Sequence, residues 1–356
     1  MNRHLCLIAA AVFAGRAFAQ VTPASGYTPP DDTPSFKVGA TIFGDYTFVA
    51  SPRATDADGN SIHPSSFNVG RAYINVTGNL NHRIAYRITP DITRETGTGS
   101  SLSGSQTFRL KYAYAQFNLD DWTTAGSWLR AGMQQTPFID YTENIYRYRF
   151  QGPIFADREG FITSSDFGLS GRWVFPSNYG EVHAGYYNGE GYSRPEANDQ
   201  KALQLRATVR PLPLGGIWKG LRLTAFVDRD AYVSHAPRNR MIGQVTFEHR
   251  RANAGVEFLQ ATDQTSSTRA DVDARGWSAW LTPKLGTAGW ELLLRHDDLK
   301  PNRSASLTRK RDIAGVAYWV PNLQKVTTAV LVDYDRLRVT GRADDTRYGV
   351  KLLINF

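Results

Sequence analysis

The stretch "YGVKLLINF", residues 348–356, decides the fold class. Every even position from Tyr348 to Phe356 is apolar or aromatic, whereas most odd positions, such as Lys351 and Asn355, are polar or small. A period of two is the pattern of a β-strand that separates two environments. The sequence therefore predicts that the chain ends inside such a strand, and the nature of the two environments becomes the question.

The same alternation recurs through the chain in about 16 segments, each near the length that a tilted strand needs to cross a bilayer. The segments are 36–48, 67–78, 82–92, 107–117, 127–135, 166–175, 180–189, 202–211, 220–229, 240–249, 253–261, 273–282, 289–297, 312–320, 325–335 and 346–356. No stretch after the N-terminal residues reaches the roughly 18 consecutive apolar residues of a transmembrane helix.

The connections between these segments alternate in kind. Those after even-numbered segments tend to be tight, such as "NLN", "PSNY" and "RRA", whereas those after odd-numbered segments are often long and polar, such as "TRETGTGSSLSGSQ". Short turns at one end and long loops at the other are typical of an outer-membrane barrel. We therefore expect residues 36–356 to form an all-β, transmembrane antiparallel β-barrel with short periplasmic turns and long extracellular loops.

The N-terminus carries the pattern of an export signal. Residues 1–19 combine Arg3, an apolar stretch and the triplet Ala17-Phe18-Ala19, which predicts a secretory signal peptide cleaved before Gln20. The only cysteine, Cys6, lies in this segment. The Pro-rich residues 20–35 are expected to be a periplasmic lead-in, and the mature chain to be a multi-pass protein of the bacterial outer membrane.

Energetics assign the faces of the strands. An Arg or Lys that faces lipid at the bilayer midplane costs about 2 to 4 kcal/mol, so the charged face must look into the lumen. The alternative for each lumen cation is that it only balances a neighbouring carboxylate. The predicted pore-lining residues are Arg71, Arg83, Arg87, Arg109, Lys111, Arg130, Arg172 and Arg206.

The third long connection, residues 136–165, is the predicted constriction. It alternates Tyr and Arg before a charged run, and the planar donor fork of Arg replaces the hydration of an anion. Arg147, Arg149 and Arg158 are expected to narrow the pore. The alternative is a solvated lid whose aromatic side chains pack on the rim.

Motifs for catalysis are absent from the sequence. There is no Gly-x-Ser-x-Gly, no His-Glu-x-x-His and no phosphate-binding glycine loop. The segment "DADGN", residues 56–60, begins like a calcium loop, but Ser61 stands where glycine is needed. We therefore expect no catalytic residues, no metal and no cofactor. A membrane-bound or secreted β-rich enzyme or carbohydrate-binding protein, and a barrel with a plugged lumen, remain the alternatives.

Several segments resemble the phosphate-selective porin O and P family across nearly the whole mature chain. They are "FNVGRAYINVTGNL", "LRAGMQQTPF", "DFGLSGR", "GYYNGEG" and "WELLLRHDDL". The resemblance implies a 16-stranded barrel, a homotrimer, a third loop folded inward and transport of phosphate. The chain departs from the family where Gly70 and Tyr73 flank Arg71-Ala72, and where Gln135 replaces a common lysine.

Together these observations predict a porin for passive diffusion of small hydrophilic solutes, with a preference for anions. The formal net charge of +8 agrees with anionic partners in general. The expected partners are outer-membrane lipid and lipopolysaccharide, small anionic solutes and two further copies of the chain in a homotrimer, but no nucleic acid.

Overall fold

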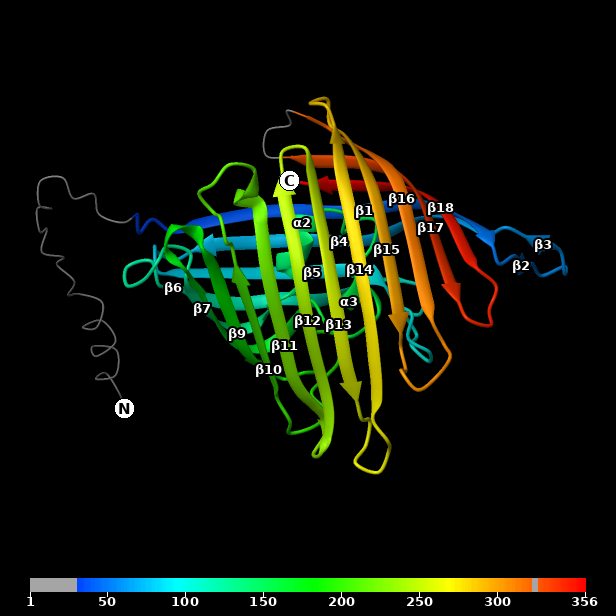
Figure 1. Cartoon of the computed structure of the whole chain (residues 1–356), viewed down its shortest axis with the longest axis horizontal. Coiled ribbons are helices and arrows are strands. Elements are labelled where there is room, and N and C mark those ends of the chain that lie inside the picture. The colour runs from blue at the N-terminus through cyan, green and yellow to red at the C-terminus, as the bar shows by residue number, and fades with distance from the viewer. Residues whose placement is uncertain (1–30, 322–325) are drawn as a thin grey trace, which may run out of the picture. The chain divides into compact units, whose positions relative to one another are not determined.

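In the computed structural model, which describes residues 31–321 and 326–356, sixteen strands form one closed antiparallel barrel (Figure 1). The predicted fold class is therefore confirmed. The predicted signal peptide and residues 20–30 of the lead-in lie outside the described residues. The strands of the barrel are β1 (Ser35–Ser51), β4 (Ser65–Asn79), β5 (Ile84–Arg94), β6 (Gln106–Asn118), β7 (Trp128–Gln135), β8 (Ser165–Val174), β9 (Gly180–Tyr187), β10 (Ala202–Val209), β11 (Leu221–Val233), β12 (Ala236–His249), β13 (Ala252–Asp263), β14 (Val272–Leu285), β15 (Trp290–Lys300), β16 (Arg309–Trp319), β17 (Thr327–Val339) and β18 (Asp345–Asn355).

The connections at the two ends of the barrel differ in length, with exceptions at each end. At the turn end they are 80–83, 119–127, 175–179, 210–220, 250–251, 286–289 and 320–326. At the loop end they are 52–64, 95–105, 136–164, 188–201, 234–235, 264–271, 301–308 and 340–344. The connection 234–235 is a tight turn with His235 at a φ of 64°, whereas 210–220 is long for a turn and contains the 3-10 helix η2 (Ile217–Gly220). The loop 52–64 carries a small sheet of β2 (Ala54–Thr55) and β3 (Ser61–Ile62).

The C-terminal strand β18, which contains residues 348–355, closes the barrel. β18 pairs with β1 in a register that places Val350 opposite Tyr46. Phe356 N donates to Ala40 O at 3.0 Å, and Ala40 N donates to Phe356 O at 2.9 Å. A Cβ at Gly39 would lie 2.4 Å from Phe356 O, so this close approach of two backbones requires glycine.

Four register shifts occur among the described strands, and the two in β4 and β6 change the alternation of inward and outward residues beside the inner part of the barrel. Between β1 and β4 the register passes from Phe43↔Arg71 to Gly44↔Val69, which leaves Gly70 unpaired. Between β5 and β6 it passes from Thr89↔Tyr112 to Pro90↔Leu110, which leaves Lys111 unpaired. A bulge adds one residue to a strand and so reverses the face of everything beyond it.

The second bulge has a direct consequence for the lumen. Leu110 on one side of Lys111 is exposed on the outer surface, whereas Tyr112 on the other side is buried. Lys111 itself is also buried, at 6% exposure. The bulge therefore sends two consecutive side chains of β6 inward and places a lysine in the interior. Among the described residues, no helix is long and apolar enough to cross a membrane.

Candidate pore constriction

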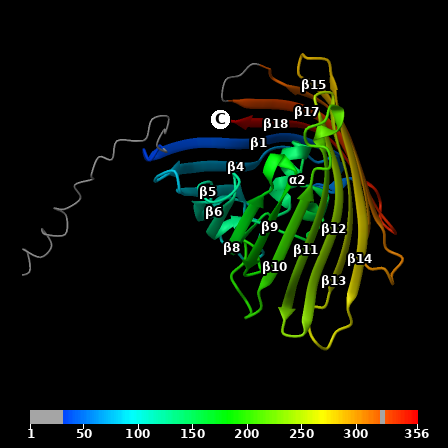
Figure 2. The same cartoon turned by 60° about the vertical axis from the view of Figure 1, so that its left-hand side comes forward.

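The connection between β7 and β8, residues 136–164, lies inside the ring of strands, and we call it the inner loop. It contains α2 (Ile139–Tyr146) and α3 (Phe155–Arg158). Figures 1 and 2 both show α2 within the space that the strands enclose. The loop is thus placed where it narrows the lumen, as the resemblance implied.

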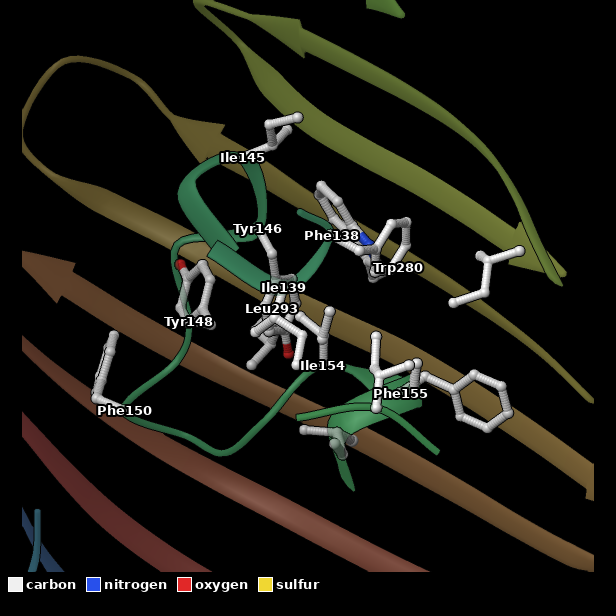
Figure 3. Close-up of a cluster of buried hydrophobic side chains, with 14 of the residues drawn as sticks. Phe138, Ile139, Ile145, Tyr146, Tyr148, Phe150, Ile154, Phe155, Trp280 and Leu293 are labelled. Carbon is white, nitrogen blue, oxygen red and sulfur yellow. The ribbon is translucent and has the colours of Figure 1, made fainter. Parts of the chain in front are cut away.

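Apolar side chains hold the inner loop against one wall of the barrel. Phe138 packs on Phe226 of β11 with ring centroids 5.3 Å apart, and Tyr146 packs on Trp280 of β14 at 5.2 Å. Leu293 of β15 lies fully buried beneath them (Figure 3). Fully burying such side chains is worth about 1.5 to 3 kcal/mol each. The loop is therefore seated mainly by the hydrophobic effect.

This wall differs from the expected polar lumen. Ile242, Leu259, Leu293, Ile313 and Leu331 point inward from β12, β13, β15, β16 and β17, with at most 2% of each exposed. Strand alternation alone does not predict this, because leucine and isoleucine also suit the lipid face. These leucine and isoleucine side chains can face inward because the inner loop covers them and shields them from water.

Polar contacts also hold the inner loop against this wall, and two arginines of the loop make them. Arg147 donates to Glu291 of β15 at 3.0 Å and stacks over Trp319 at 4.1 Å. Arg158 lies 3.5 Å from a carboxylate oxygen of Asp335 on β17. Both arginines thus face the apolar wall and are paired with its carboxylates.

The third loop arginine lies elsewhere. Arg149 pairs with Glu143 of α2 at 2.8 Å and is 3.9 Å from Asp157. Burial raises the pKa of Glu143 to about 7, and the positive charge of Arg149 offsets only part of this effect. The Glu143 carboxyl therefore titrates near neutral pH, while Arg149 stays charged.

Two cavities flank α2 on the side away from the apolar wall. The larger lumen cavity, of about 390 Å³, lies against residues of β7 to β11, and the smaller lumen cavity, of about 240 Å³, lies against residues of β1 and β4 to β6. Asp140 and Asn144 of α2 line both. The two cavities thus meet along one polar face of this short helix.

Three strand cations line these cavities without a carboxylate partner. Within residues 31–321 and 326–356, no ion pair of 4.0 Å or less involves Arg87, Lys111 or Arg130. Arg87 bonds to Asn75 at 2.8 Å and Thr89 at 2.9 Å.

Neutral partners hold the other two cations of this set. Arg130 donates to Gln116 at 2.7 Å and to Gln135 at 2.9 Å, and it lies 3.8 Å over the ring of Trp128. Lys111 Nζ lies 4.7 Å over the ring of Tyr73. Hydrogen bonds and rings orient these cations without cancelling their charge. We call Arg87, Lys111 and Arg130 the unpaired row, since they lie on the successive strands β5, β6 and β7.

The remaining predicted pore residues are paired. Arg71 and Arg109 share Asp91, with Arg109 Nε 2.9 Å from its carboxylate. Arg172 and Arg206 share Glu181.

Arg206 also ties the larger cavity to the inner loop. It donates to the carbonyl oxygen of Pro137 at 2.6 Å and lies 3.9 Å over the ring of Tyr141. Arg172 and Arg206 line the larger lumen cavity beside Arg130. Arg83 lies apart, in the turn 80–83, where it pairs with Asp121 at 2.8 Å.

The acidic face of α2 was missed from the sequence. Asp140, Glu143 and Asn144 fall on one side of the segment "IDYTENIY", while Ile139, Thr142, Ile145 and Tyr146 fall on the other and are buried. This spacing of three and four residues is the signal of an amphipathic helix, and it could have located α2. Gln135, noted only as a departure from the family pattern, bonds to Arg130.

Comparisons with known proteins agree with this architecture. The family model of phosphate-selective porin O and P matches residues 36–225. A search of curated proteins finds no match.

Solved structures give the same fold at low identity. The anion-selective porin from Comamonas acidovorans superposes with a TM-score of 0.59 at 12% identity, covering 91% of this chain and 99% of that one. The outer-membrane channel DcaP of Acinetobacter baumannii gives 0.58 at 12%, covering 91% and 97%. The trimer form of OmpT, an outer-membrane protein of Vibrio cholerae, gives 0.58 at 13%, covering 91% and 100%. With its own barrel and the match over residues 36–225, the chain belongs to the phosphate-selective porin O and P family and is a channel of the bacterial outer membrane.

Proposed function

We propose that this porin lets small hydrophilic solutes diffuse passively through its lumen and that it prefers anions. The observation that carries the proposal is the unpaired row. Arg87, Lys111 and Arg130 line the cavities beside α2, and neutral groups rather than carboxylates hold them. A cation with no carboxylate within 4.0 Å remains able to attract an anion from the solution.

The mechanism follows from weak contacts at several successive sites. Rings beneath the cations fix their positions, while Asp140 and Glu143 on the opposite face of the passage limit how tightly an anion is held. Conduction needs attraction strong enough for entry and weak enough for exit. A row of cations facing a few carboxylates meets both requirements.

Phosphate is the anion that the family description adds to the proposal. The test is whether inorganic phosphate, added to one side of a bilayer, lowers the chloride current through single channels. We also propose a homotrimer, supported by the trimer form of OmpT from Vibrio cholerae among the similar structures. Native mass spectrometry of the detergent-purified protein measures the number of copies directly.

Anion preference is tested by the reversal potential of purified channels in a planar bilayer under a KCl gradient. A unit charge about 7 Å from a permeating ion contributes about 0.6 kcal/mol even at the dielectric constant of water. The variant Arg87→Gln/Lys111→Gln/Arg130→Gln should therefore lose most of the anion preference. The matched control changes three exposed cations at the loop end, Arg269→Gln/Arg303→Gln/Arg342→Gln.

The control should keep its reversal potential near that of the unchanged protein. If the unpaired-row variant folds into a heat-modifiable barrel and keeps the full anion preference, the proposal is wrong. A cation-selective unchanged protein would contradict it as well.

A further inference from the structure

The turn end of the barrel holds a feature that the channel does not use. A groove of about 800 Å³ lies between the turn 210–220, the turn 250–251 and the end of β14, and we call it the rim groove. Its lining includes Ile217, Lys219, Arg250, Arg251 and Lys284. None of these residues lines either cavity beside α2.

The charge of the rim groove is positive and largely uncompensated. The groove contains one carboxylate, Glu248, which is already paired with Arg222 at 2.7 Å. In the described part of the chain, Lys219, Arg250 and Arg251 form no ion pair of 4.0 Å or less. These three side chains are also exposed. Unlike the unpaired row, they have no side-chain hydrogen bonds or ring contacts recorded among the described residues that hold them in place.

Exposed apolar side chains lie in the turn 210–220, which forms one side of the groove. In the long turn 210–220, Leu214 is 75% exposed and Trp218 is 55% exposed. The Trp218 ring packs against Phe247 of β12, with centroids 6.2 Å apart. Phe247 has the same parity as Val245 and Met241, which are exposed on the outer face. The turn thus carries its tryptophan to the lipid-facing surface beside the cations.

Tryptophan beside basic residues is the arrangement found where a protein meets lipid headgroups. Short turns of outer-membrane barrels face the periplasm, so this rim lies at the inner leaflet. Basic hollows at a membrane surface bind phosphate-bearing headgroups, and arginine provides a donor fork that matches a phosphate.

We propose that the rim groove is a binding site for an anionic phospholipid of the periplasmic leaflet. The headgroup phosphate lies among Lys219, Arg250 and Arg251, and the acyl chains run along the outer wall beside Ile217 and Trp218. A free phosphate ion would use the cations but leaves the exposed apolar rim without a partner. The inference rests on the membrane placement of the barrel and is independent of its anion preference.

The experiment compares lipids bound to the purified full-length protein. The unchanged protein is equilibrated in mixed micelles with phosphatidylglycerol and phosphatidylcholine, and bound lipids are counted by native mass spectrometry. We expect a severalfold preference for phosphatidylglycerol. The variant Lys219→Gln/Arg250→Gln/Arg251→Gln should lose it, whereas the control Arg269→Gln/Arg303→Gln/Arg342→Gln should keep it. An excess of inorganic phosphate should not displace the lipid.

Three outcomes would overturn the proposal: equal preference in the unchanged protein and the groove variant, an equal loss in the control, or displacement by inorganic phosphate, which would identify a free-anion site. A second measurement needs no charge variant. Brominated phosphatidylglycerol should quench the tryptophan fluorescence of the unchanged protein more than brominated phosphatidylcholine does, and Trp218→Phe should remove that difference. If the difference persists in Trp218→Phe, the lipid binds elsewhere.

Discussion

The wall formed by β5, β6 and β7 and the wall formed by β15, β16 and β17 both carry cations that approach the inner loop. On the second wall each arginine meets a carboxylate, as Arg295 meets Asp297 at 2.8 Å and Arg311 meets Asp335 at 2.7 Å. On the first wall the unpaired row meets amides, hydroxyls and rings. Basic side chains therefore form ion pairs that hold the inner loop on one side of the lumen. On the other side, basic side chains have no carboxylate partner and can attract anions.

The number of arginines on a wall of the barrel therefore does not determine the electrostatic potential in the lumen. The pairing of each arginine also matters. A paired cation in a low-dielectric interior contributes structure, and its removal strands a carboxylate. An oriented but unpaired cation contributes potential in the passage. Single substitutions can disrupt the two arrangements separately.

Unseating the inner loop should have the largest effect. Phe138→Ala removes a fully buried ring that packs on Phe226, and such a change costs about 3 to 5 kcal/mol. The loop should then leave the apolar wall, and single-channel conductance should change and become noisy. Phe67→Ala, at a ring that is 83% exposed on the outer face, is the control and should leave conductance as it is. Unchanged conductance in Phe138→Ala would show that other contacts seat the loop.

Removing a cation from each arrangement should separate them. Arg130→Gln removes an unpaired charge and should lower the anion-to-cation permeability ratio severalfold, since even about 0.6 kcal/mol alters the occupancy of an ion about threefold. Arg147→Gln removes a charge that Glu291 already balances at 3.0 Å. It should lower thermal stability more than Arg130→Gln does, because the buried carboxylate of Glu291 then has no cation beside it and keeps the Tyr148 hydroxyl as its partner. If both variants changed the reversal potential and the melting temperature equally, the proposed difference between paired and unpaired cations would be wrong.

Glu143 should make the selectivity depend on pH. Burial raises the pKa of this carboxyl from 4.5 to about 7, so it is protonated below that pH and charged above it. Protonation removes the negative charge beside Arg149 in the smaller lumen cavity. Anion preference should therefore rise as pH falls through about 7, as measured by reversal potential.

The variant Glu143→Gln provides the control for this step, because its side chain cannot titrate. It should show the low-pH selectivity at every pH. A pH step that survives in Glu143→Gln would belong to another group.

The smallest effect is expected at Arg83, which sequence parity placed in the pore. Its pair with Asp121 lies in the turns, with 47% of the arginine side chain exposed, and such pairs contribute about 0 to 1 kcal/mol. Arg83→Gln should leave both selectivity and melting temperature nearly unchanged. If Arg83→Gln lost as much anion preference as Arg130→Gln, Arg83 would contribute to the pore as the sequence pattern predicted.

Much of the barrel was predictable, because alternation and turn composition are local. Strand positions and antiparallel closure follow from patterns such as "YGVKLLINF", whereas the inward third loop was implied only by the resemblance of segments such as "LRAGMQQTPF" to the porin family. The bulges at Gly70 and Lys111 were not predicted, since a one-residue slip is set by pairing between strands.

The pairing state of each cation was not predictable either. Asp91 lies on β5 and serves arginines of β4 and β6, and Glu291 meets an arginine 144 residues away in sequence. Such partners are brought together only by the register of the barrel and the seat of the inner loop. The alternation of residues along a strand predicts that a cation faces inward. It does not predict whether a neighbouring carboxylate neutralises that charge.

The most direct measurement is the position of anions in crystals of this porin soaked in bromide, located by anomalous diffraction. We expect bromide in the two cavities beside α2, within contact distance of Lys111 Nζ and the guanidinium groups of Arg87 or Arg130. Bromide found beside Arg147 and Arg158, with none along the unpaired row, would contradict it.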